Sequence, residues 1–266
     1  MDPSPAPVDP QAARPPVAGL DRPARVLVAG ASGGIGGALV AALDADPGVG
    51  TLLAVGGRAP PPLPRPDAPG RHALACDLTD PRALAGLADR AGTLSAGGLD
   101  LVINAAGLLH GPGIRPEKAL AQVGLAALHR VFAVNAFAPV LLAQALLPLL
   151  RHGGPAVFAS LSARVGSIGD NRLGGWYAYR AAKAAQNQFM RTFAIELRRA
   201  NPAAACLLLH PGTVDTPLSR PFQSGVEPGR LFAPDLAAGH LLAVIASATP
   251  ADSGRFLAWD GQAIPW

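Results

Sequence analysis

The chain has 266 residues, of which 50% are hydrophobic and 15% are charged. It can therefore bury one large core, and because an α/β domain of about 240 residues is a normal size, we expect a single domain. The formal charge of +4 comes from 22 basic and 18 acidic residues. Such a modest excess, with no basic stripe interleaved with aromatic residues, argues against a nucleic-acid-binding protein.

The cysteines and the amino terminus bear on the cellular location. Cys76 and Cys206 lie in apolar, strand-like runs, and their spacing indicates neither a disulfide framework nor a metal site, which favours a reducing cytoplasm. Residues 1–23 are rich in Pro and Ala and lack the apolar core of a secretion signal, so we expect a disordered leader before a domain at 24–266. Later apolar runs contain polar residues or Pro within about 18 residues, so no membrane span is expected.

A glycine-rich turn follows the first predicted strand. The apolar run 25–29 stops at the segment 30–36, Gly-Ala-Ser-Gly-Gly-Ile-Gly, and a helical stretch comes next. Gly30 permits a tight turn, Gly34 lets the backbone approach a pyrophosphate, and Gly36 allows close packing. The free N–H groups at the helix start favour phosphate binding. This order indicates a dinucleotide site, although a glycine cluster alone is also typical of a flexible loop.

The second and third predicted strands indicate which nucleotide would bind. Strand 51–55 leads to Arg58 without the Asp or Glu that would bind the ribose hydroxyls of NAD. The guanidinium of Arg58 instead suits a 2′-phosphate, which favours NADP(H) over NAD(H); the alternative is a solvated loop arginine. Asp77 lies at the carboxyl end of strand 73–78. It either reaches the adenine or caps the helix start near residues 79–81.

Two polar features follow in the middle of the chain. Strand 99–103 is followed by Asn-Ala-Ala-Gly at 104–107, where small residues either let the backbone pass close to a cofactor or form an ordinary turn. A long helical pattern at 125–150 contains Asn135 among apolar residues. Because a buried Asn is costly without partners, Asn135 satisfies a helix defect, holds a water near the reaction centre, or does both.

The carboxyl-terminal half alternates strands and helices. Strands are expected at 156–161, 204–210 and 255–258, and helices at 176–199 and 234–246. The segment that runs from Pro211-Gly212 to about Arg230 carries the apolar residues Leu218 and Phe222. Mobile loops after the carboxyl end of a strand suit a substrate lid, so we expect one here.

Tyr179 and Lys183 are the strongest candidates for chemistry. They lie four residues apart on a predicted helix, so they share one face with Cβ atoms roughly 6 Å apart. Acid/base work near neutrality requires the phenol pKa to fall by about 3, or roughly 4 kcal/mol, which Lys183 and a cationic cofactor ring would supply. Of the 22 basic residues only Lys118 and Lys183 are lysines. The alternative is a half-exposed tyrosine packed under a lysine stem.

Taken together, these motifs resemble those of the short-chain dehydrogenase/reductase family. The similarity covers about residues 24–259, and the segment 162–183 resembles the C-factor-like and carbonyl-reductase-like branch. The resemblance implies an α/β, Rossmann-type doubly wound domain with a mainly parallel seven-stranded sheet. It also implies hydride transfer between a nicotinamide and a carbonyl or alcohol carbon, in a homodimer or homotetramer.

The resemblance also assigns roles to residues. Tyr179 would exchange a proton with the substrate oxygen, Lys183 would bind the nicotinamide ribose and lower the phenol pKa, and Asn135 would anchor a relay water. The expected cofactor-binding residues are Gly30, Ser32, Gly33, Gly34, Ile35, Gly36, Arg58, Asp77, Leu78, Asn104, Ala105, Ala106, Gly107, Tyr179, Lys183, Pro211, Gly212, Val214 and Thr216. No metal site is expected.

One departure from the family pattern affects the catalytic serine. The S-x-x-G pattern that ends at Gly166 places this serine at position 163, where the chain has Ala163. Ser162 takes the role if the loop is rearranged, which we favour, with Ser160 and Ser167 as the neighbouring hydroxyls. Otherwise substrate polarisation is weakened, at a cost on the order of 10²-fold in rate. A nucleotide-sensing or signalling protein with little catalysis is therefore the alternative function.

The substrate is expected to be a small carbonyl or alcohol compound. Five apolar residues either line a substrate pocket or pack in the core or lid: Leu108, Leu109, Trp176, Leu218 and Phe222. As a pocket they would favour a lipophilic or aromatic carbonyl compound. We expect neither nucleic acid nor a membrane as a partner.

Overall fold

The structure is a computed structural model that describes residues 16–266. Seven strands form one sheet in the order β3-β2-β1-β4-β5-β6-β9, and all neighbouring strands in it are parallel. The strands are β1 Ala24–Ala29, β2 Val49–Gly56, β3 Arg71–Ala75, β4 Leu101–Asn104, β5 Ala156–Leu161, β6 Ala204–His210 and β9 Phe256–Ala258. This topology confirms the predicted doubly wound sheet, and β5 and β6 have the expected bounds.

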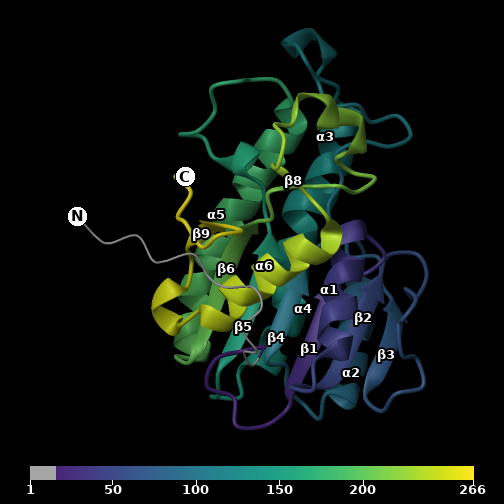
Figure 1. Cartoon of the computed structure of the whole chain (residues 1–266), viewed down its shortest axis with the longest axis vertical. Coiled ribbons are helices and arrows are strands. Elements are labelled where there is room, and N and C mark those ends of the chain that lie inside the picture. Colours follow the sequence, from purple (N-terminus) through teal and green to yellow (C-terminus); the bar gives the residue numbers. More distant parts are fainter. Residues whose placement is uncertain (1–15) are drawn as a thin grey trace.

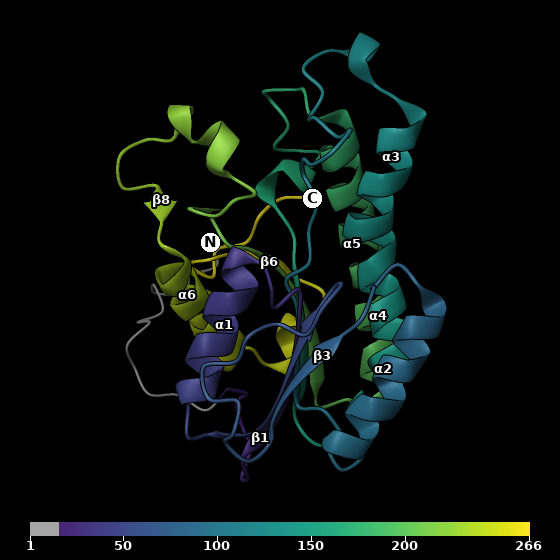
Figure 2. The same ribbon diagram turned by 90° about the vertical axis from the view of Figure 1, so that its right-hand side faces the viewer.

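Helices cover both faces of the sheet in a three-layer arrangement (Figures 1 and 2). One face carries α1 (Gly34–Ala45) and α6 (Pro234–Ser247), and the other carries α2 (Pro81–Leu94), α4 (Ala138–Leu146) and α5 (Tyr177–Ala200). Consecutive strand residues alternate between the two cores, as Leu27 and Val28 do. Because both faces are buried, the strands are nearly continuous apolar runs.

Shorter elements connect these layers. Two short strands, β7 (Thr213–Val214) and β8 (Leu231–Phe232), pair in parallel beside the carboxyl end of β6. The 3-10 helices are η1 Leu120–Gln122, η3 Leu147–Leu150, η4 Arg164–Gly166, η5 Arg220–Gly225 and η6 Pro250–Asp252. The expected lid segment therefore contains β7 and η5 and is followed by β8.

The long helix expected at 125–150 is divided by a π-helical segment. α3 (Leu125–Phe132) passes into η2 (Ala133–Phe137) and then into α4. Pro139 has no N–H for the helical bond to residue 135, which explains the change of winding. By length and mean hydropathy (1.8), Leu125–Leu150 would be able to cross a membrane. Here it is a core helix, with Leu142 and Leu146 fully buried.

Two residues of the expected leader contact the domain. Residues 1–15 of that leader lie outside the described residues, and most of residues 18–23 are exposed. Val17 is buried in the core on the α1 and α6 side, and Arg22 pairs with Asp100 at 2.7 Å. An apolar side chain and a charge before residue 24 thus find partners in the domain, and the boundary at residue 24 stays a prediction.

Candidate active site

The glycine turn between β1 and α1 is closely packed. Gly30 has a φ of +79°, and a Cβ on it would lie 2.5 Å from the Ala106 nitrogen, so this position requires glycine. A Cβ on Gly36 would collide with the Gly30 carbonyl oxygen, and one on Gly34 would lie 2.5 Å from Thr216 Cγ2. Gly30 thus makes the expected tight turn, Gly36 allows the expected close packing, and Gly34 leaves room for Thr216; the approach of Gly34 to a pyrophosphate stays a prediction.

The amino terminus of α1 suits a phosphate. Its N-cap residue, Gly33, provides no side-chain hydrogen bond to the first turn of the helix, so within the described chain that turn is not capped by its own cap residue. Ser32 is exposed, and its hydroxyl lies against Gly56, where a Cβ would come within 2.6 Å of it. Ile35 lines the main cavity described below. A helix start of this kind attracts anions.

A cavity of about 180 Å³ lies beside this turn, at the carboxyl ends of β1, β2 and β3. It is lined by Gly30, Val55, Gly56, Gly57, Cys76, Asp77, Leu78, Thr79, Ala106, Val134 and Ala138. Asp77 accepts hydrogen bonds from the Thr79 nitrogen at 2.9 Å and the Thr79 hydroxyl at 2.7 Å. Asp80 caps α2 itself. Asp77 thus stabilises the turn before the helix while it lines the cavity.

Arg58 follows Gly57, which lines this cavity. Hydrogen bonds from Thr79, together with the positive charge of Arg58, lower the pKa of Asp77. Arg58 is exposed, as expected for a side chain that is to contact a phosphate in solvent. Its position agrees both with a 2′-phosphate contact and with a solvated loop arginine.

The main cavity, of about 300 Å³, lies at the carboxyl ends of β4, β5 and β6. Its lining includes Ile35, Ala105, Ala106, Gly107, Ser162, Tyr179, Lys183, Pro211, Gly212, Val214 and Thr216, all expected from the sequence. Ala106 borders both cavities. The two cavities thus meet next to Gly30, which contacts Ala106, and such an arrangement suits an extended ligand.

Tyr179 and Lys183 lie on one face of α5, as predicted. Both line the main cavity, and the Lys183 Nζ is 5.8 Å from the centre of the Tyr179 ring. Burial raises the pKa of Tyr179 and lowers the pKa of Lys183 to about 7. The chain alone therefore opposes the phenol ionisation that we expected Lys183 to promote.

A buried polar network surrounds Lys183. The Nζ donates hydrogen bonds to the Leu161 carbonyl at 2.9 Å and to Gln186 Oε1 at 2.8 Å. Gln186 Nε2 donates to Ser160 Oγ at 2.8 Å, which also accepts from Asn104 Nδ2 at 3.1 Å. Sequence reasoning missed Gln186. Its position one turn after Lys183, on the buried face of α5, is the signal that would have revealed it.

The serines near Ala163 differ in their surroundings. Ser162 lines the main cavity, but its hydroxyl donates to Asn187 Oδ1 at 2.6 Å. Ser160 is held in the network around Lys183, and Ser167 accepts a hydrogen bond from the Asp170 nitrogen at 3.1 Å. Ala163 lines the cavity with a methyl group, as its position in the family pattern implies.

His210 is a cavity residue that sequence reasoning also missed. It lines the main cavity, and its buried Nδ1 makes no hydrogen bond within residues 16–266. Burial lowers its pKa to about 4, so the imidazole is neutral at pH 7. Its place at the end of β6, directly before Pro211, marks it as a residue at the carboxyl edge of the sheet.

Asn135 lies in the π-helical segment and stabilises it. Its Nδ2 donates to the Val131 carbonyl at 2.9 Å and to the Leu108 carbonyl at 2.7 Å, and its Oδ1 accepts from the Leu108 nitrogen at 3.0 Å. The helix-defect alternative is therefore correct. Through Leu108 the same amide also fixes the segment after β4.

Aromatic and aliphatic residues enclose the outer part of the main cavity. Leu109, Trp176, Leu218 and Phe222 line it, whereas Leu108 packs beside it. The Trp176 ring makes edge contacts with Tyr179 at 6.3 Å and with Phe222 at 5.0 Å between centroids. These contacts agree with a substrate pocket.

Trp176 has an unusual backbone conformation. Its φ is +51°, and Gly174 and Gly175 before it are also left-handed. A bulky residue rarely adopts this conformation, which costs on the order of 1–2 kcal/mol. Glu117 holds the turn, since its carbonyl accepts from the Trp176 nitrogen and its carboxylate accepts from the Ala178 nitrogen at 3.2 Å. The surrounding structure thus stabilises the Trp176 ring over Tyr179.

Comparison with known proteins agrees with this geometry. The model of the short chain dehydrogenase family matches residues 24–227. The chain is 38% identical to C-signal of Myxococcus xanthus over 170 residues, which is 64% of this chain and 94% of that protein. It is also 38% identical to 1-hydroxy-2-glutathionyl-2-methyl-3-butene dehydrogenase of Rhodococcus sp. (strain AD45) over 141 residues, 52% of this chain and 58% of that enzyme.

A solved structure extends the comparison to the whole fold. The NADPH-bound carbonyl reductase from chicken fatty liver superposes with a TM-score of 0.78 and 28% identity, over 92% of this chain and 100% of that one. The family model and the fold thus agree with each other. The chain belongs to the short-chain dehydrogenase family and is an oxidoreductase.

Proposed function

We propose that this oxidoreductase uses NADP(H) to interconvert a carbonyl and an alcohol on a small, apolar substrate. The observation that carries the proposal is the convergence of Tyr179 and Lys183 on one cavity that borders the glycine turn. When bound, the nicotinamide supplies or accepts the hydride. The protein then has to move one proton and orient both reactants.

In this proposal Tyr179 transfers the proton to or from the substrate oxygen. Its burial keeps the phenol protonated, so the chain favours the acid form that carbonyl reduction requires. Lys183, one helical turn away, binds the ribose and favours the phenolate that forms on proton transfer. Asn135 holds the segment after β4 in place and anchors a relay water.

The substrate oxygen also needs a hydrogen-bond donor, and Ser162 is our candidate. Its hydroxyl lines the cavity but donates to Asn187, so it has to turn away from Asn187 to reach a substrate. Ala163 offers no alternative hydroxyl at the expected position. The Tyr179 hydroxyl therefore has to polarise the substrate carbonyl more strongly than it would in a site with two free hydrogen-bond donors.

The first experiment tests Tyr179. NADPH oxidation would be screened over ketones, aldehydes and quinones, and Tyr179→Phe is expected to lower turnover of the best substrate by about 10²–10⁴-fold. NADPH affinity, measured by fluorescence titration, should change little. Tyr177→Phe is a matched control, because Tyr177 is the chain's other tyrosine, two residues away, with 41% of its surface exposed. Equal turnover in wild type and Tyr179→Phe would contradict the proposal.

The preference for NADP(H) rests on Arg58. A guanidinium on the rim of the cavity beside the turn suits a 2′-phosphate, and the chicken carbonyl reductase binds NADPH. Arg58→Glu is expected to raise the Kd of NADPH at least tenfold while leaving that of NADH nearly unchanged. Arg198→Glu, at the exposed carboxyl end of α5, is the control. Equal weakening of both cofactors would remove Arg58 from this role.

A second candidate function is nucleotide-dependent signalling with little catalysis. Ala163 at the expected serine position favours it, as does the similarity to C-signal. In that case the chain would bind NADPH but would not oxidise it with any compound in the screen. A carbonyl-dependent turnover that Tyr179→Phe abolishes would exclude it.

We also propose a cytoplasmic homodimer or homotetramer. Both cysteines are buried free thiols, which suits a reducing compartment. Phe137, Phe189 and Ile195 are exposed apolar residues on η2 and α5, on the side of the long helices. Apolar residues of this kind suit an interface between copies of the chain.

A further inference from the structure

Lys183 is a buried lysine without an anionic partner among the described residues. Its side chain is almost fully buried, and none of the ion pairs within residues 16–266 includes it. A protonated amine has three N–H groups, and each costs free energy if it is left unpaired in the core. Two of them have neutral acceptors, the Leu161 carbonyl and Gln186 Oε1. One N–H therefore remains for a group in the cavity.

The Gln186 amide has only one orientation that suits its neighbours. Gln186 is 0% exposed, and its Nε2 donates to Ser160 Oγ at 2.8 Å and to the Leu161 carbonyl at 3.1 Å. A flipped amide would place its NH₂ group against the ammonium, so two donors would face each other, and Ser160 Oγ and the Leu161 carbonyl would each lose one of their two donors. The hydrogen bonds thus direct Oε1 toward Lys183.

Ser160 and Asn104 hold the amide from the sheet. Ser160 Oγ accepts from Gln186 Nε2 and, at 3.1 Å, from Asn104 Nδ2. Ser160 and Asn104 are fully buried and lie side by side on the neighbouring strands β5 and β4. Because α5 packs on these strands, the hydrogen bonds from Asn104 and Gln186 to Ser160 fix Gln186 relative to the carboxyl edge of the sheet.

We propose that Gln186 is a positioning residue for Lys183: together with the Leu161 carbonyl it fixes two of the three ammonium N–H directions, so that the remaining one points into the main cavity that Tyr179 also lines. The inference rests on the proposed function for its catalytic meaning. That the Gln186 oxygen orients the Lys183 ammonium and keeps it charged does not depend on which reaction the protein catalyses.

The other titratable groups around the cavity do not replace this acceptor. They are Tyr179 on α5, Arg164 on η4 and His210 on β6. Tyr179 is neutral because burial raises its pKa, and His210 is neutral because burial lowers its pKa to about 4. Arg164 has the same charge as Lys183 and pairs with Asp170 at 2.8 Å. Gln186 and the Leu161 carbonyl are thus the groups that stabilise the charge on Lys183.

The lysine content of the chain allows a direct test. Lysine labelled with ¹³C at Cε gives two NMR signals from the intact chain, one from buried Lys183 and one from exposed Lys118. Lys118→Arg assigns them. A pH titration then reports the midpoint of Lys183, with Lys118 as an internal control, and it requires neither substrate nor cofactor.

Gln186→Leu removes the acceptor but keeps most of the volume. Because a hydrogen bond to a charged group is worth about 1.5–3 kcal/mol, the Lys183 midpoint is expected to fall by about 1 or more. Gln186→Glu keeps an oxygen acceptor and adds a negative charge, so the midpoint is expected to rise. If Gln186→Leu does not fold, the Glu variant, which has nearly the same shape, still decides the question. Midpoints equal to wild type in the variants that fold would overturn the proposal.

Kinetics separates this inference from the proposed function. If both hold, the pH dependence of kcat/KM shifts in the same direction as the NMR midpoint, down in Gln186→Leu and up in Gln186→Glu. If the NMR midpoint moves while Tyr179→Phe retains full turnover, Gln186 positions Lys183 but the proposed chemistry is wrong. If turnover depends on Tyr179 and the midpoint does not move, the proposed function stands and the role of Gln186 is overturned.

Discussion

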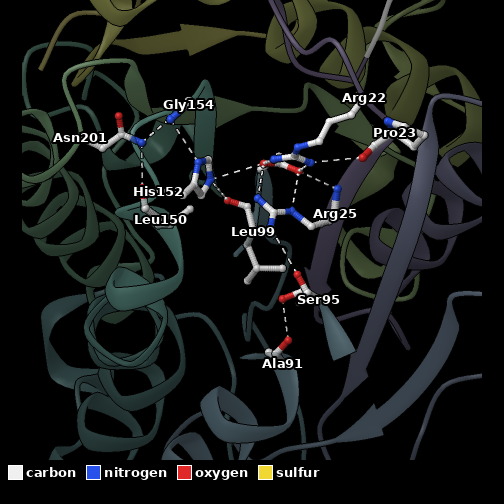
Figure 3. A network of polar contacts seen from close by, with 11 residues as sticks. Arg22, Pro23, Arg25, Ala91, Ser95, Leu99, Leu150, His152, Gly154 and Asn201 are labelled. Atoms are coloured by element: carbon white, nitrogen blue, oxygen red, sulfur yellow. Dashed lines mark hydrogen bonds and ion pairs between the residues drawn. The ribbon is translucent and has the colours of Figure 1, made fainter. Parts of the chain in front are cut away.

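Two buried polar clusters lie at opposite edges of the sheet and solve the burial of charge differently. The Asp100 cluster, at the amino-terminal edge, consists of Asp100, Arg22, Arg25 and His152 (Figure 3). The Lys183 cluster, at the carboxyl edge, consists of Lys183, Gln186, Ser160 and Asn104. Each has a charged side chain that is almost fully buried. The first surrounds its charge with opposite charges, and the second provides only neutral oxygens.

The Asp100 cluster is arranged for stability. Arg22 donates to both carboxylate oxygens at 2.7 Å, and Arg25 donates to them at 2.9 and 3.0 Å. Burial alone would raise the pKa of Asp100, but these hydrogen bonds outweigh it and hold the pKa well below the usual range. Paired forks of this kind are among the stronger interactions in proteins.

The Lys183 cluster contains the lysine to which the proposed function assigns a role. Burial lowers the pKa of Lys183 to about 7, so the charged form is destabilised relative to an exposed lysine. A buried lysine of this kind lowers stability. Such residues are expected mainly where the side chain has a function. The charge on Asp100 therefore stabilises the fold, whereas the charge on Lys183 costs stability.

The largest expected effect concerns Asp100→Asn. Removing the charge leaves two guanidinium groups without their anion, so the free energy of unfolding at pH 7 is expected to fall by about 3 kcal/mol. Because the folded pKa is depressed, this stabilisation is fully present above the unfolded value of about 3.9 and is lost as the pH falls below it. In urea unfolding, the difference between wild type and variant should therefore begin to shrink below about pH 4 and disappear only as the pH approaches the much lower folded pKa.

Asp89→Asn serves as the control for this measurement, since Asp89 is exposed on α2. It should change the free energy of unfolding by no more than about 0.5 kcal/mol at any pH. A loss for Asp100→Asn that stays constant from pH 7 to pH 3 would show that the cluster acts through packing rather than through charge. The contrast with the Lys183 cluster would then disappear.

Much of the fold followed from local patterns in the sequence. The apolar runs at 156–161 and 204–210 predicted β5 and β6 with the correct bounds, because strands buried on both faces leave a continuous signal. Pro81 after Asp80 marked the start of α2. The break after α3 was not predicted, because it depends on how Asn135 and Pro139 act together inside one apolar stretch.

The site was predictable only in part. Regular spacing on a helix placed Tyr179 and Lys183 together, and the cavity confirms that they share one face. Gln186, Ser160 and Asn104 come from three different elements, so their contact depends on tertiary packing that spacing does not encode. The same applies to Asp100 and Arg22, which are 78 residues apart and meet only in the folded chain.

A smaller effect of opposite sign is expected when the Lys183 cluster is made apolar. The double variant Lys183→Met with Gln186→Leu removes the buried ammonium and the acceptor that would otherwise be left unpaired. Replacing buried charged groups with apolar ones of similar volume often stabilises a protein, and a gain of about 1 kcal/mol or more is expected at pH 6. Lys118→Met, at an exposed position, is the control.

The pH dependence of that gain distinguishes charge from packing. The folded pKa of Lys183, about 7, lies below the unfolded value of about 10.4, so the unfolded chain binds more protons between these values. Wild-type stability should therefore rise relative to the double variant as the pH increases from 7 to 10, and the gain should shrink. Urea unfolding at pH 6 and pH 9.5 measures both. If the double variant is less stable than wild type at pH 6, by an amount that does not change with pH, the Lys183 cluster stabilises the fold as the Asp100 cluster does.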